Sequence, residues 1–62
     1  MNEYYANARD IILRKIDDLK EIELSEFHIR MYVRGMVAGL GISNMLSDKE
    51  LEELRKECLK EI

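Results

Sequence analysis

The first third of the chain repeats hydrophobic residues with the period of an α-helix. Apolar side chains recur three or four positions apart, which places them on one helix face; they are Tyr5, Ala8, Ile12, Ile16 and Leu19. Three further apolar residues, Ile11, Leu13 and Ile22, widen this stripe. We therefore predict a first helix over about residues 2–21.

The start signals of two more helices follow. Ser25 can cap a helix N-terminus, and Leu24 and Ile29 stand at the two positions of a hydrophobic staple. This second helix is predicted over residues 26–40, with Gly41 as a left-handed C-terminal stop. "SDKE" reads as a capping box of Ser47 and Glu50, and it predicts a third helix over residues 48–61.

These elements predict an all-α fold in a single small domain, residues 1–62. The connection between the second and third helices is short, so we expect them to form a helical hairpin. A chain of 62 residues buries little surface, and a domain of this size often depends on a disulfide, a metal or a partner subunit.

The middle helix is apolar around nearly its whole circumference. Its only charged residues are Glu26, Arg30 and Arg34. A helix of this kind is normally buried on all sides, yet two flanking helices can cover one side only. We therefore predict a homodimer or higher homo-oligomer that buries the second side, formed by His28, Met31, Tyr32, Gly35, Ala38 and Gly39.

Gly35 and Gly39 lie one helical turn apart and would leave a notch in that side. A second backbone can approach closely at such a notch. The alternative is that these glycines pack against the first helix of the same chain.

A possible partner-binding group lies beside this surface. Phe27, Arg30 and Arg34 combine an aromatic ring with two guanidinium groups, as binding hot spots often do. The competing interpretation is that Glu26 pairs with Arg30, and that Arg34 reaches acidic residues of the first helix.

Composition restricts the remaining function classes. Cys58 is the single cysteine, so no internal disulfide can form, and a lone thiol favours the cytoplasm. The N-terminal stretch is polar, so we expect no secretory signal, and no apolar run is long enough to span a membrane. A net charge of −3 makes nucleic acid an unlikely partner.

No set of residues predicts catalysis. His28 is the only histidine, Cys58 lies in an apolar stripe, and neither has the neighbours that a metal site or a nucleophile requires. "GMVAGLG" lacks the lysine and the loop of a phosphate-binding motif. We expect no enzyme, no cofactor and no metal.

One segment resembles a known DNA-binding family. "VAGLGISNMLSDKEL", residues 37–51, is similar to the turn region of helix-turn-helix proteins. The resemblance implies a DNA-binding regulator whose third helix reads the major groove. Here, however, Ala38 precedes Gly41 by three residues rather than the four usual in the family, and the third helix is rich in glutamate.

The sequence thus favours a non-enzymatic protein-interaction module, a homo-oligomeric regulator or inhibitor of another protein. Its size and simplicity suit a small bacterial regulator. A helix-turn-helix-like DNA-binding regulator is the alternative.

Overall fold

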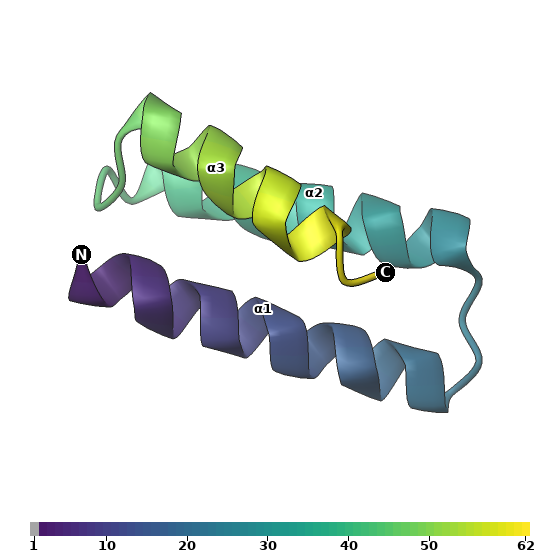
Figure 1. Ribbon diagram of the computed structural model, residues 1–62. Coiled ribbons are helices and arrows are strands. Elements are labelled where there is room, and N and C mark those ends of the chain that lie inside the picture. Colours follow the sequence, from purple (N-terminus) through teal and green to yellow (C-terminus); the bar gives the residue numbers. More distant parts are fainter. Residues whose placement is uncertain (1) are drawn as a thin grey trace.

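The computed structural model describes residues 2–62, and that part of the chain forms three helices and no strand. They are α1 (Glu3–Glu21), α2 (Glu26–Ile42) and α3 (Asp48–Leu59). Successive helices run in opposite directions along one long axis, so that α3 returns beside α2 (Figure 1). The molecule measures 32 × 18 × 17 Å. The predicted all-α fold with a hairpin between the second and third helices is confirmed.

One hydrophobic core joins the three helices. Each helix contributes the apolar positions that share one of its faces, and the residues of α1 are those of the predicted stripe. The buried set is Tyr5, Ala8, Ile12, Ile16, Leu19, Ile29, Val33, Val37, Leu46, Leu54 and Cys58. Ile11 and Ile22 were expected to widen the stripe, but they are 57% and 69% exposed, because they lie at its outer edge and beyond the end of α1.

Side-chain caps begin all three helices, as the sequence predicts for the second and third. Ser25 Oγ accepts from the backbone N–H of His28, and Ser47 Oγ accepts from that of Glu50. Glu50 in turn accepts from the backbone N–H of Ser47, which completes the capping box. These bonds satisfy amides that the helix itself leaves unpaired.

The end of α1 is a Schellman motif built without glycine. Leu24 N–H donates to the carbonyl of Leu19 at 3.1 Å, and Glu23 N–H donates to that of Lys20 at 3.0 Å. Glu23 adopts φ 60°, the left-handed conformation that this motif needs and that glycine normally supplies.

The end of α2 differs from its prediction. Gly41 is not a left-handed stop; it is helical, and α2 continues to Ile42, two residues beyond the predicted end. Asn44 takes the left-handed conformation instead, at φ 59°. Gly41 has a packing role, since a Cβ there would lie 3.3 Å from Leu51 Cδ1 of α3. The other bounds differ little: α1 begins at residue 3 and α3 ends at residue 59.

We predict that Glu23→Gly stabilises the fold by about 0.5–1 kcal/mol. A non-glycine residue in the left-handed region costs about 1–2 kcal/mol, of which the greater freedom of glycine in the unfolded chain offsets part. For a domain of this size the melting temperature should rise by about 2–8 °C, measured by circular dichroism at fixed protein concentration.

Glu53→Gly is the matched control, because it makes the same change at an exposed helix-interior position of α3. It should destabilise the fold by about 1 kcal/mol. A lower melting temperature in both variants would show that Glu23 carries no conformational cost.

Candidate functional site

The outward side of α2 is uncovered along its whole length. Ile29, Val33 and Val37 face the core, and the residues on the opposite side of the helix are exposed. We call this surface the open face of α2; it consists of Phe27, His28, Met31, Tyr32, Gly35, Ala38, Gly39 and Ile42. All six residues predicted at a subunit contact belong to it, and all six are exposed.

The open face is strongly apolar for a solvent-exposed surface. Phe27 is 67% exposed and Ile42 is 84% exposed, while Met31 and Tyr32 expose about half of their surface. Met45, in the connection that follows α2, is also exposed. By contrast, no large hydrophobic side chain of α3 is exposed, and the outer positions of that helix are charged. Most of the exposed large apolar side chains therefore belong to α2, while Ile11 of α1 and Ile22 at its end are exposed elsewhere.

Gly35 and Gly39 form a shallow notch in the open face. A Cβ atom built on either glycine meets nothing within 4 Å. The interpretation that these glycines allow close packing against α1 is therefore wrong. Inside a helix each costs about 0.5–1 kcal/mol relative to alanine, so the fold of the single chain gains nothing from them.

Basic side chains lie along both edges of the open face. On the edge toward α1, Lys15 Nζ stands 5.8 Å from the centre of the Tyr32 ring. A groove between the two helices continues this edge, lined by Ile11, Arg14, Lys15, Asp18 and Met36. Arg34 lies on the opposite edge, about 160° around the helix from Tyr32 at 100° per residue.

The predicted partner-binding group divides in the structure. Arg30 donates two hydrogen bonds to Glu26 Oε1, at 3.1 and 3.2 Å, so the predicted pair within α2 is confirmed. Arg34 does not reach the acidic residues of α1, because within residues 2–62 it takes part in no ion pair. Phe27 packs edge-on against the ring of His28, with ring centres 5.5 Å apart.

Sequence reasoning missed part of this surface. Ile42 was left out because the helix was expected to end at residue 40, and Met45 because it follows that helix. Extending the helical spacing past Gly41 would have placed Ile42 on the same side as Met31, Gly35 and Ala38.

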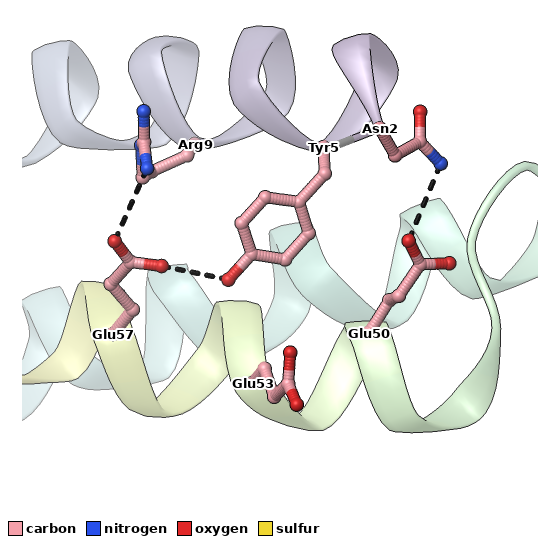
Figure 2. Close-up of a pocket in the computed structure, with 6 residues that line it drawn as sticks. All are labelled: Asn2, Tyr5, Arg9, Glu50, Glu53 and Glu57. Atoms are coloured by element: carbon pink, nitrogen blue, oxygen red, sulfur yellow. Dashed lines mark hydrogen bonds and ion pairs between the residues drawn. The ribbon is translucent and has the colours of Figure 1, made fainter.

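Away from the open face of α2, a cluster of polar side chains joins α1 to α3 (Figure 2). Tyr5 Oη donates to Glu57 Oε2 at 2.7 Å, and Arg9 Nη1 donates to Glu57 Oε1 at 3.3 Å. Asn2 Nδ2 donates to Glu50 Oε2 at 3.4 Å. Figure 2 shows these side chains of α1 pointing toward the carboxylates of α3, each with a partner within the chain. We interpret the cluster as a link between the two helices.

Burial raises the pKa of Tyr5 to about 12, and its hydrogen bond to the negatively charged Glu57 acts in the same direction. The phenol is therefore a proton donor to Glu57 rather than a base. The hydroxyl of a buried tyrosine requires a partner, but the sequence gives no sign that Glu57, 52 residues away, would be that partner.

The structure gives little support to chemistry at Cys58. The thiol is fully buried, and its pKa is raised to about 11 by burial and by the adjacent Glu57. Among residues 2–62 no three His, Cys, Asp or Glu side chains are placed to hold a metal ion. No helix in the same range is long and apolar enough to cross a membrane.

The segment that resembles a helix-turn-helix has a different geometry. In that motif the two helices cross at about 90–120°, whereas α3 runs back alongside α2 (Figure 1). The segment Gly41–Ile42, expected in the turn, forms the last part of α2.

The chain matches no protein-family model, no curated protein and no solved structure.

We predict that Tyr5→Phe lowers the free energy of unfolding by about 1 kcal/mol at pH 7, through loss of the hydrogen bond to Glu57. The folded pKa of Tyr5 is raised from 10.0 to about 12, so its contribution is fully present below pH 10 and is lost as the pH rises to 12. The difference between the two proteins should shrink over that range in urea titrations.

Tyr4→Phe removes a phenol that has no hydrogen bond to Glu57 and serves as the control. A difference between wild type and Tyr5→Phe that stayed constant from pH 8 to 12 would contradict the assigned proton donation.

Proposed function

We propose that this protein is a non-enzymatic interaction module that self-associates through the open face of α2. In this form it acts as a regulator or inhibitor of another protein. The observation that supports the proposal is the exposure of four large apolar side chains, with a glycine notch between them, on one side of one helix.

The size of the apolar surface supports a stable contact. The open face with Met45 exposes roughly 600 Å² of large side chains, taking about 200 Å² for each when fully exposed. That is the upper end of apolar patches on monomeric proteins, many of which bind partners. A standard interface buries about 800 Å² on each partner, so a second molecule has to cover nearly the whole length of the face.

The free energy of apolar burial, set against the cost of association, also favours a contact along the length of α2. Covering half of this surface on each of two copies would contribute about 15 kcal/mol at 25 cal/mol per Å². Association itself costs about 4–15 kcal/mol. A contact along the whole helix covers more of this surface than a contact at one end, and it therefore leaves a larger surplus over the cost of association.

The glycines give a second line of support. Gly35 and Gly39 lower the helix propensity of α2 and have no packing role within the chain. A close approach by another backbone would use both absent side chains.

We predict that Ile42→Glu abolishes self-association at micromolar concentration. The substitution places a charge on the open face, and burying an unpaired charge in an apolar contact is strongly unfavourable. Sedimentation equilibrium should give the mass of a single chain for the variant and of an oligomer for the wild type.

Ile22→Glu is the matched control, since Ile22 is also an exposed isoleucine at a helix end but lies off the open face. It should retain the wild-type mass. A wild-type chain that remained single at 100 µM would overturn the proposal, as would equal effects of the two substitutions.

We further predict opposite effects of the double substitution Gly35→Ala with Gly39→Ala on folding and on assembly. Alanine should stabilise the single chain by about 0.5–1 kcal/mol per site, because nothing obstructs either Cβ. The same methyl groups should fill the notch and raise the dissociation constant at least tenfold. Urea unfolding at low concentration and sedimentation at high concentration measure the two effects; an unchanged dissociation constant would exclude the notch from the contact.

A further inference from the structure

The open face of α2 has a symmetrical distribution of side-chain sizes. Large side chains stand at its start, Phe27 and Met31, and at its end, Ile42, with Met45 beyond it. Gly35, Ala38 and Gly39 lie between them, centred on about residue 37. A second copy with the same profile can place small residues against small ones and large residues against large ones.

Resting on the proposed self-association, we infer that two copies pair their α2 helices antiparallel and cross at Gly35, Ala38 and Gly39. The first-turn side chains of one helix then pack against the last-turn side chains of the other. Met31, six residues before the centre, comes level with the region of Ile42, five residues after it.

The charged edges of the open face distinguish this arrangement from a parallel one. In a parallel two-fold pair, the Lys15 edge of one helix faces the Arg34 edge of the other helix. Equivalent residues of the two helices then lie at the same height along the axis. Arg34 would then lie beside Tyr32 and its neighbour Lys15, on the edge whose groove also holds Arg14 and Asp18, so that cations outnumber the single acid at both symmetry-related places.

In the antiparallel pair, the Arg34 edges of the two helices face each other, and so do the Lys15 edges. Residues before the centre of one helix then lie level with residues after the centre of the other. The two Arg34 side chains are then six residues apart, about 9 Å along the axis at 1.5 Å per residue. The two Lys15 side chains are separated further. On this edge Arg34 comes level with about residue 40 of the second copy. The groove between α2 and α3 on this edge is lined by Val37, Leu51, Glu52 and Arg55, so it carries one charge of each sign.

The helix dipoles also favour the antiparallel pair. Each end of α2 carries partial charge from its unpaired backbone groups. Opposite ends lie next to each other only when the helices run in opposite directions.

Disulfide trapping distinguishes the two orientations. Met31→Cys and Ile42→Cys are prepared as separate chains and oxidised with glutathione disulfide, either alone or mixed in equal amounts. The antiparallel pair predicts a linked heterodimer in the mixture, at least fivefold above the linked dimers that either chain forms alone. Met31→Cys mixed with Lys49→Cys, a position on the charged side of α3, measures chance collisions. Cys58 is fully buried, and wild type should give no linked product.

Each reduced variant is first checked for assembly by sedimentation. Nuclear Overhauser contacts in wild-type protein, mixed from isotope-labelled and unlabelled chains, provide a second measurement without substitutions. Contact between the Met31 and Ile42 methyl groups of different chains is expected.

Linked dimers of Met31→Cys alone in an amount equal to or greater than the heterodimer of the mixture, or a mixture no better than the Lys49→Cys control, would overturn the antiparallel arrangement and leave self-association intact. A wild-type chain that sediments as a single molecule would instead overturn the proposed function itself.

Discussion

Two short helices can pack against only one side of a third, and the structure of this chain depends on that constraint. α1 and α3 both pack against the inward side of α2, where Ile29 and Val33 are almost completely buried. Nothing in residues 2–62 remains to pack on the other side. Because that side exposes Phe27, Met31 and Ile42, the fold of one chain leaves part of its hydrophobic burial incomplete.

The outer surfaces of the three helices differ in their share of charged and apolar side chains. α1 and α3 meet water through charged side chains and are joined to each other by Tyr5, Arg9 and Glu57. α2 presents the largest group of exposed apolar side chains, Phe27, Met31, Tyr32 and Ile42, while α1 exposes Ile11.

The three glycines of α2 show how one residue type serves two purposes. Gly41 leaves room for Leu51, so that α3 can turn back closely against α2. Gly35 and Gly39 leave room for nothing within the chain. The absence of intramolecular contact at these two positions makes them the most informative residues of the open face.

The sequence by itself determined the three helices, the N-terminal caps of the second and third, and the inward stripe of each, because helical period and capping are local properties of the chain. It also indicated that His28, Met31, Gly35 and Gly39 share a side of α2, since spacing alone decides which residues share a helix face. Only the tertiary structure decided which sides of the helices meet. It left Ile11 exposed, placed Gly41 of α2 against Leu51 of α3, and brought Tyr5 to Glu57. These outcomes depend on distances between segments far apart in the chain, and residue spacing within one helix carries no information about them.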